Sequence, residues 1–233
     1  LDNSLGSDTR RWEVGEGSRH VIIISDPAAR GPDRAALRAP EQLLGESWIS
    51  HLPRGEAGRW LSTLITNATD VLETHPVNRV RVDLGENPAN GVWLWGGGPG
   101  SSGQTFRQRR GCSGAVIAND FFLRGFARVQ ELTWQAAPAS LDEEAVRSLA
   151  KTVEGLSSRH DLIYVHLPIT TGEPVERQCA MDRIDQWLVK PLVQHAGANR
   201  RLAVLVDERT NGSITTVAIG DGLPQQPVVS LHP

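Results

Sequence analysis

The sequence is poor in cysteine, tyrosine and methionine, and the shortage of cysteine excludes several classes of protein. Its 233 residues include two cysteines, Cys112 and Cys179, one tyrosine and one methionine. Two cysteines without a metal-ligand spacing or a repeated pattern argue against a disulfide framework and against a zinc knuckle. We therefore expect a protein of a reducing compartment, the cytoplasm.

Long apolar runs and an excess of one charge are also missing. No apolar run approaches the ~20 residues that a membrane-spanning helix needs, and the polar first eighteen residues do not resemble a signal peptide. The 24 basic and 27 acidic residues give a net charge of −3, without a basic stripe. Nucleic acid and membrane insertion are therefore not expected. The chain is nevertheless long enough to bury a sizeable core.

Segments with the pattern of strands alternate with segments that have the pattern of helices. Apolar runs predict buried strands at 21–24, from 114, from 161 and at 201–208, and GVWLWGGG predicts a short strand at 91–98. Helical spacing of apolar residues predicts helices at 56–75, after Asn119 or Asp120, after Ser140 or Asp142, and at 176–195. Pro191 is expected to bend the last helix or to end it early. This alternation is typical of an α/β fold with a largely parallel sheet.

One segment, HPVNRVRVDLGENPANGVWLWGGG at 75–98, concentrates polar side chains that suit an anionic ligand. Five of them can donate or accept hydrogen bonds at such a ligand: His75, Asn78, Arg79, Arg81 and Asn90. The same residues also fit plain structural roles. His75 follows a predicted helix, where it could satisfy the last carbonyls. Trp93 and Trp95 have the alternation of core or interface residues on a strand.

Segment 75–98 resembles the archaeal-type cofactor-independent phosphoglycerate mutases, in which HPVN or HPIN, an Arg, NPAN and a WLWG run occur in this order. Four further segments match that family in the same order: SRHVIII, GAVIANDFFLRG, DLIYVHLP and MDRIDQWLVKPL. The resemblance covers most of residues 18–210. It implies an alkaline-phosphatase-like α/β fold, with a mostly parallel sheet flanked by helices and part of a smaller inserted domain at the N-terminal end. On this reading, residues 1–55 are the remnant of the inserted domain and its connector, and residues 56–233 are part of the α/β domain.

The resemblance also implies an activity and a catalytic centre. The family interconverts 3- and 2-phosphoglycerate through a phosphoenzyme, with a Ser nucleophile and two divalent metals held by Asp and His. Five residues match family positions that approach the substrate: Arg19, His20, His75, Asn78 and Arg81. An alternative role for all five is to join the small domain to the sheet by hydrogen bonds.

The metal ligands of the family are poorly matched in this chain. The family's metal-binding Asp strand and its Ser nucleophile precede the matched part. Its acidic loop PDEAGHEG is replaced here by PITTGEPVERQ, and no histidine occurs between His166 and His195. Asp207 stands at one ligand position and is the surviving metal candidate, although a strand-end Asp also commonly caps its own turn. Because one ligand cannot hold two Mn2+ or Mg2+ ions, we expect no bound cofactor unless the family activity is retained.

Three functions remain open on the sequence alone. The first is a non-catalytic structural or interaction subunit that has lost the metals and the nucleophile. The second is an incomplete chain of an active, metal-dependent mutase, and the third is a metal-free binder of a phosphorylated small acid. Seven tryptophans beside a single tyrosine suit an interface, so a protein complex or a homo-oligomer is the expected assembly.

Overall fold

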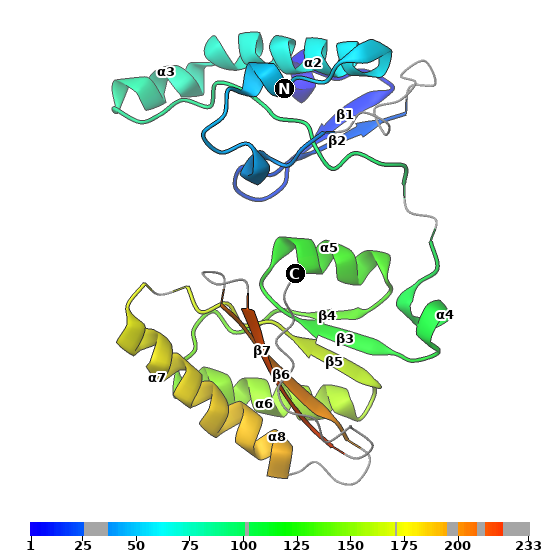
Figure 1. The fold of residues 1–233 in the computed structure, drawn as a ribbon, viewed down its shortest axis with the longest axis vertical. Coiled ribbons are helices and arrows are strands. Elements are labelled where there is room, and N and C mark those ends of the chain that lie inside the picture. Colours follow the sequence, from blue (N-terminus) through cyan, green and yellow to red (C-terminus); the bar gives the residue numbers. More distant parts are fainter. Residues whose placement is uncertain (26–36, 101–102, 171, 195–199, 209–212, 221–233) are drawn as a thin grey trace. The chain divides into compact units, whose positions relative to one another are not determined.

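The computed structural model describes residues 1–25, 37–100, 103–170, 172–194, 200–208 and 213–220. Its contacts divide the chain into two compact units, Leu1–Ser102 and Gly103–Pro233 (Figure 1). None of the described helices is long and apolar enough to cross a membrane.

The first unit packs one long helix against a short antiparallel ribbon. Its elements are α1 (Asp2–Leu5), β1 (Arg10–Glu13), β2 (Val21–Ile24), the 3-10 turns η1 (Pro40–Gln42) and η2 (Trp48–His51), α2 (Gly55–Glu73) and α3 (Pro76–Asp83). The core is built on the buried stripe of α2, Leu61, Leu64 and Ile65, against which Trp12 and Ile22 of the ribbon pack. The amphipathic helix predicted at 56–75 is thereby confirmed. Each fully buried side chain of this size contributes about 1.5–3 kcal/mol.

The boundary between the two units differs from the boundary drawn on the sequence. The predicted α/β domain begins at residue 56, yet α2 shares its core with β1 and β2, and the contact boundary falls at Ser102. The apolar face of α2 is covered by residues on both sides of it in the sequence, among them Trp12, Ile22 and Leu94, which helical periodicity alone does not reveal. The division into an inserted-domain remnant at 1–55 and an α/β domain at 56–233 stays a prediction, because compact units defined by contacts do not test it.

Two strand predictions in the first unit need correction. Strand β2 exists, but it pairs only with β1 among the described strands, and Val21 is 49% exposed, so it is not a buried strand. Segment 91–98 has no strand, because no described strand runs beside it to complete a hydrogen-bond ladder. The Trp93 side chain instead packs against the core around α2, and its indole N–H donates to the Arg38 carbonyl at 2.9 Å.

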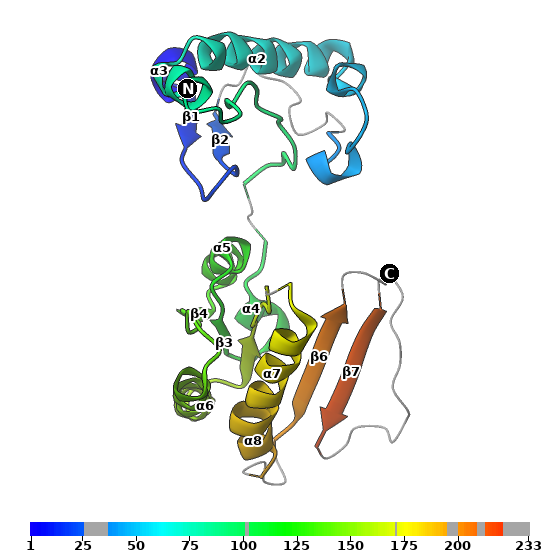
Figure 2. The ribbon, with the colours of Figure 1, turned by 90° about the vertical axis from the view of Figure 1, so that its left-hand side faces the viewer.

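The second unit contains a parallel sheet with the strand order β4-β3-β5. Its elements are α4 (Phe106–Arg110), β3 (Gly114–Ile117), α5 (Phe121–Val129), β4 (Thr133–Gln135), α6 (Glu143–Ser157), β5 (Leu162–Val165), α7 (Pro174–Ile184), the π-turn η3 (Asp185–Val189), α8 (Lys190–Gln194), β6 (Leu202–Glu208) and β7 (Ser213–Ile219). Helices α5 and α6 cover opposite faces (Figure 2). Successive residues of β3 point to opposite faces of the sheet, and this accounts for the arrangement: Val116 packs with Ala127 of α5, and Ile117 packs with Val146 of α6.

Helix starts in the second unit follow the predicted capping signals. Of the two candidates before α5, Asp120 is the cap, since its Oδ1 accepts from the Leu123 amide at 2.8 Å. Before α6, Asp142 accepts from the Ala145 amide at 2.9 Å, and Ser140 donates its hydroxyl to the other oxygen of Asp142. The hydrogen bond from Ser140 contributes most, and together these bonds hold the pKa of the Asp142 carboxyl below its usual range.

The helix predicted at 176–195 changes its register ahead of Pro191. The Lys190 amide bonds to the Asp185 carbonyl five residues back, which makes the wide π-turn η3, and helical structure resumes in α8. A proline has no N–H, and its ring clashes with the carbonyl four residues earlier, so a wider turn accommodates it. The helix therefore does not end early at Pro191, as one of the two expectations had it, but continues through Gln194 after a change of register.

Strands β6 and β7 form a two-stranded antiparallel ribbon. The strand predicted at 201–208 is confirmed as β6, but its complete burial is wrong, because Leu205 is 59% exposed. A ribbon that pairs with no other described strand leaves part of its apolar surface uncovered.

Asp161 links the start of β5 to the start of β3, and this contact predicts a pH dependence. The Ser113 amide and hydroxyl each donate to Asp161 Oδ2 at 2.8 Å, and they hold the pKa of Asp161 below its ordinary value of 3.8. When the pKa of a carboxyl is lower in the folded chain than in the unfolded chain, the carboxyl stabilises the fold at any pH above its pKa in the unfolded chain. This contribution is lost as the pH falls through its pKa in the folded chain. The difference in unfolding free energy between wild type and Asp161→Asn should therefore be present at neutral pH and vanish in acid.

An NMR titration of the carboxyl carbons measures this pKa directly. Ser113→Ala removes the hydroxyl donor and keeps the amide donor, so it should return the pKa of Asp161 only part of the way toward 3.8. A wild-type pKa at or above 3.8 would contradict the assignment.

Candidate functional site

Helix α3 gathers three of the five predicted substrate-binding side chains, and His75 begins it. The His75 Nδ1 accepts a hydrogen bond from the Val77 amide at 3.3 Å and so caps the helix. The backbone amide of His75 donates to the Leu72 carbonyl at 3.0 Å, at the end of α2. The imidazole thus caps the following helix, and the main chain satisfies the preceding one.

Asn78 is the buried polar centre of this region. It is 5% exposed, and its Nδ2 donates to the Leu72 carbonyl at 2.6 Å and to the Ala89 carbonyl at 2.7 Å. Its Oδ1 accepts from the Ala89 amide at 2.9 Å. Both amide hydrogens and the carbonyl oxygen are therefore engaged with main chain, which ties the end of α2 to the NPAN loop.

Arg81 binds the same loop from the last turn of α3. Its Nε donates to the Asn87 carbonyl at 2.8 Å, and its Nη2 lies 3.5 Å from Glu86 Oε2. The Glu86 amide in turn donates to the Arg81 carbonyl at 2.8 Å. Both side chains of the ion pair are about half exposed, so the charge–charge contribution is small and the hydrogen bond to main chain is the stronger contact.

Arg19 and His20 lie apart from the α3 group, in the connection between β1 and β2. The His20 Nδ1 accepts from the Gly15 amide at 3.2 Å, and Arg19 Nη2 lies 3.5 Å from Glu41 Oε1. A side chain at Gly15 would clash with the Arg19 carbonyl, so this turn requires glycine. No hydrogen bond or ion pair between described residues joins this pair to His75, Asn78 or Arg81. The structure thus brings three of the five together.

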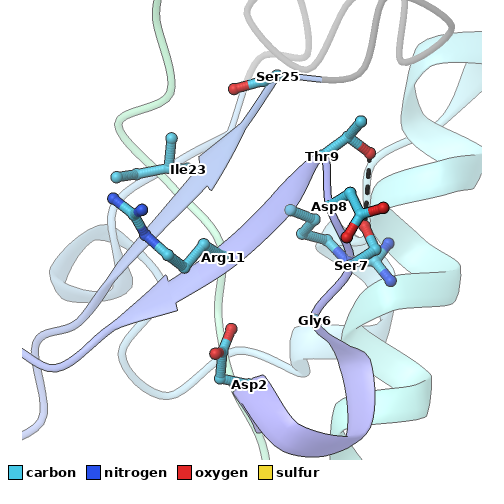
Figure 3. A pocket seen from close by; sticks show the side chains of 9 residues that line it. Asp2, Gly6, Ser7, Asp8, Thr9, Arg11, Ile23 and Ser25 are labelled. Carbon is cyan, nitrogen blue, oxygen red and sulfur yellow. Dashed lines mark hydrogen bonds between the residues drawn. The ribbon is translucent and has the colours of Figure 1, made fainter.

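A polar pocket of about 350 Å3 lies elsewhere in the first unit (Figure 3). Nine residues line it: Asp2, Gly6, Ser7, Asp8, Thr9, Arg10, Arg11, Ile23 and Ser25. The guanidinium of Arg10 is held by the Leu5 carbonyl at 2.6 Å, and Arg11 is paired with Glu13. With two acidic and two basic residues, the lining carries no net preference for an anion. The sequence analysis missed this pocket, since polar residues in this order match no ligand motif.

In α/β folds with a parallel sheet, residues just beyond the carboxyl ends of the strands commonly line a ligand crevice, and in this chain those residues are only partly described. After β5, His166 donates its amide to the Ile117 carbonyl at 2.9 Å, and its Nδ1 is buried without a hydrogen-bond partner in the described structure. After β3, Asn119 donates to the Pro138 carbonyl at 3.2 Å. Trp95 follows no strand and is exposed. Thr171 and 209–212 lie outside the described residues.

The metal candidate Asp207 lies in β6, where its backbone is paired with Ile214 of β7. Its side chain and that of Glu208 lie outside the described part of the chain. Among the described residues, no group of three or more His, Cys, Asp and Glu side chains converges. The donor set that the structure describes therefore does not fit a two-metal centre, which needs several carboxylates and imidazoles around each pair of ions.

Comparisons with known proteins place the chain beside one class of enzyme. No protein-family model matches the chain. It is 32% identical over 227 residues to the 2,3-bisphosphoglycerate-independent phosphoglycerate mutase of Methanosarcina acetivorans and 31% identical over 229 residues to that of Methanosarcina barkeri. These matches cover 93% and 94% of this chain but 56% of each relative. The chain thus spans about half the length of these relatives.

A solved structure supports the fold independently of the sequence matches. The cofactor-independent phosphoglycerate mutase of Thermoplasma acidophilum superposes with a TM-score of 0.58 at 21% identity, over 94% of this chain and 58% of that one. The predicted fold class, an alkaline-phosphatase-like α/β fold with a parallel sheet flanked by helices, is confirmed. The resemblance to the archaeal-type cofactor-independent phosphoglycerate mutases is confirmed as well.

Proposed function

We propose that this chain, which resembles the archaeal-type cofactor-independent phosphoglycerate mutases along most of its length, acts as a non-catalytic structural or interaction subunit in the cytoplasm. One observation carries the proposal. Four of the five side chains that would grip a phosphoglycerate bond to the protein's own backbone, namely His20, His75, Asn78 and Arg81, and Asn78 does so with both amide hydrogens and its oxygen. A side chain that is buried and satisfied in this way specifies structure rather than a ligand.

The donor set supports the same proposal. At the matched ligand positions inside the chain, residues 168–178 carry no histidine, and Glu208 stands beside Asp207 where the family has a histidine. These differences lie within the matched segments, so they do not depend on where the sequence starts. A single Asp cannot position two divalent ions for transfer of a phosphoryl group.

A second candidate function is favoured by the extent of the sequence match. Identity of 32% over 93% of the chain, to a relative named as a mutase, suits a part of an active mutase that converts 3-phosphoglycerate to 2-phosphoglycerate. In that case Mn2+ or Mg2+ would be required, and most of its ligands would come from polypeptide outside these 233 residues. Metal-free binding of a phosphorylated small acid is less favoured, because Arg81 and Asn78 already bond to main chain.

We expect the purified 233-residue chain with Mn2+ to produce no 2-phosphoglycerate from 3-phosphoglycerate above a protein-free background. The measurement is the phosphorus NMR spectrum of the reaction mixture over hours, with the Methanosarcina acetivorans mutase as the positive control. Turnover by the chain alone would contradict the proposal.

Two additional measurements separate the remaining candidates. Turnover that appears when polypeptide from the unmatched part of the Methanosarcina relative is added would favour the second candidate. Calorimetry with 3-phosphoglycerate tests the binder: heat with wild type that is lost in Arg81→Ala would support it, whereas no heat with either protein removes it.

A further inference from the structure

Asn90 and Gly91 form the one Asn–Gly pair among the residues that the structure describes, in the loop that follows α3. Both residues are exposed, and they lie in neither a helix nor a strand. The side-chain amide of Asn90 and the main-chain amide of Gly91 form no hydrogen bond with any described residue. These two neighbouring groups are therefore available to react with each other.

An asparagine that precedes a glycine can cyclise without an enzyme. The main-chain nitrogen of the glycine loses its proton and attacks the carbonyl carbon of the asparagine side chain, so that a new C–N bond forms, the bond to the side-chain nitrogen breaks and ammonia leaves. Water then opens the imide ring at one of its two carbonyl carbons, which gives aspartate or isoaspartate. Glycine favours the ring closure because it has no Cβ to obstruct the attack and because its backbone adopts many conformations.

The neighbouring asparagines lack the features that make Asn90 reactive. Asn78 lies in α3, and its side chain is held by three hydrogen bonds to main chain. Asn87 is exposed in the same loop as Asn90, but Pro88 follows it. Because a proline nitrogen carries no hydrogen, it cannot act as the attacking group. The local structure thus singles out Asn90 in this part of the chain.

We propose that Asn90 is a site of spontaneous covalent modification, at which deamidation through a cyclic imide with Gly91 yields isoaspartate and aspartate. The reaction needs only water and the atoms of the loop itself. The inference does not rest on the proposed function, since a non-catalytic subunit and a part of an active mutase would carry the same reactive pair.

The isoaspartate product lengthens the main chain at a point where both flanks are anchored. In isoaspartate the main chain runs through the former side-chain carbonyl, so one methylene group is added between positions 90 and 91. On one side, the amide and carbonyl of Ala89 are bonded to Asn78. On the other side, Trp93 packs against the core around α2. The added length therefore strains the hydrogen bonds that tie the loop to Asn78.

The first test follows the mass of the full 233-residue chain during incubation in neutral buffer. One tryptic peptide, residues 82–107, contains both Asn87 and Asn90, so mass spectrometry reads the reactive site and its internal control together. Residue 90 should gain the mass that corresponds to exchange of ammonia for water, in two products of equal mass that chromatography separates, and Asn87 should stay unchanged. The rate should lie within about tenfold of that of a synthetic peptide of residues 86–95, because a loop without restraining hydrogen bonds opens at little cost.

Two glycine variants test the assigned nucleophile. In Gly91→Ala, the added Cβ would lie 3.7 Å from Thr69 Oγ1, which is an ordinary contact, so the fold should accept it. The methyl group obstructs the attack on the Asn90 side chain, and the variant should deamidate at least about tenfold more slowly. The matched control is Gly98→Ala, at an exposed position where a Cβ meets no other atom, and its Asn90 should react as in wild type.

Hydrogen exchange tests the structural consequence. In the isolated isoaspartate form, the Ala89 amide should exchange at least about fivefold faster, as expected for the loss of one hydrogen bond of about 1 kcal/mol. The variant Asn90→Asp is the control, because it carries the new charge without the added methylene group. Its Ala89 amide should exchange at the wild-type rate.

Three outcomes would overturn the inference: the chain stays unmodified while the synthetic peptide converts, Asn87 deamidates as fast as Asn90, or Gly91→Ala reacts no more slowly than wild type. The second outcome would indicate direct hydrolysis by water instead of a cyclic imide. An unchanged exchange rate at Ala89 in the isoaspartate form would overturn the strain assigned to the loop. The readouts are mass and exchange, so failure here is distinguishable from failure of the proposed function, which is judged by turnover.

Discussion

Replacement of Asn78 by alanine is expected to destabilise the first unit by about 3 kcal/mol, because it removes three hydrogen bonds made by a side chain that is 5% exposed. The Leu72 carbonyl, and the amide and carbonyl of Ala89, would be left without the side-chain partner that now satisfies them. Each hydrogen bond between neutral groups contributes about 1 kcal/mol net, so the loss of three accounts for an effect of this size. The effect should therefore exceed that of a typical surface substitution several-fold.

Hydrogen exchange at the α2 amides, such as that of Ile65, is the appropriate measurement. A chain with two compact units need not unfold in a single transition, so a local probe reports on the first unit where a global melting curve does not. Asn90→Ala, at an exposed position of the same loop, is the matched control and should change the free energy of opening by less than about 0.5 kcal/mol.

The same experiment discriminates between the two roles considered for Asn78. A residue kept for a ligand would lose binding and leave the ligand-free protein nearly as stable as before. A loss of less than about 1 kcal/mol in the ligand-free chain would contradict the structural role, since one neutral hydrogen bond alone is worth about that much.

Features that depend on neighbouring residues could be predicted from the sequence. The stripe of α2, Leu61, Leu64 and Ile65, follows from helical spacing, because residues three and four apart share one face. Asp120 could likewise be proposed as one of two candidate caps, because a capping side chain bonds to an amide only three residues further along the chain. These signals need no knowledge of what lies elsewhere in the chain.

Features that depend on distant partners could not be predicted. Trp93 and Trp95 alternate as on a strand, yet a strand exists only where another strand completes its hydrogen bonds, and segment 91–98 has no such neighbour among the described residues. The run at Val21–Ile24 has the composition of a buried strand. Composition does not reveal how many strands will pair with it, however, and a two-stranded ribbon buries one face at most.

The candidate site illustrates the same limit. Residue types indicated that His75, Asn78 and Arg81 could bind an anion, but the helix that holds them, α3, was not predicted from the sequence. Which partner each side chain takes depends on the loop at 86–90 that folds back onto α3, and there the Asn78 amide and the Arg81 guanidinium meet main-chain carbonyls. The polar pocket near Ser7 was missed because its lining comes from α1, the turn after it and two strands, β1 and β2, which pair with each other.

The largest single-residue effect in the second unit is expected at Ile117. This side chain has no exposed surface, lies in the central strand β3 and packs with Val146 and Val165 from the helix and the strand beside it. Ile117→Ala removes buried methyl and methylene groups and leaves a cavity that the strands on both sides cannot close. The loss of unfolding free energy should be about 4 kcal/mol, near the upper part of the range for such truncations.

Exchange at the α6 amides, such as that of Leu149, measures this loss, and Val175→Ala at an exposed position of α7 is the control that should change little. The size of the effect depends on how far the site can collapse, because a relaxed cavity costs less than a rigid one. Here the backbone of β3 is fixed by hydrogen bonds to β4 and β5, so collapse requires a shift of α6 toward the sheet. A loss below about 2 kcal/mol would mean that α6 makes this shift, and that the core is less rigid than its burial indicates.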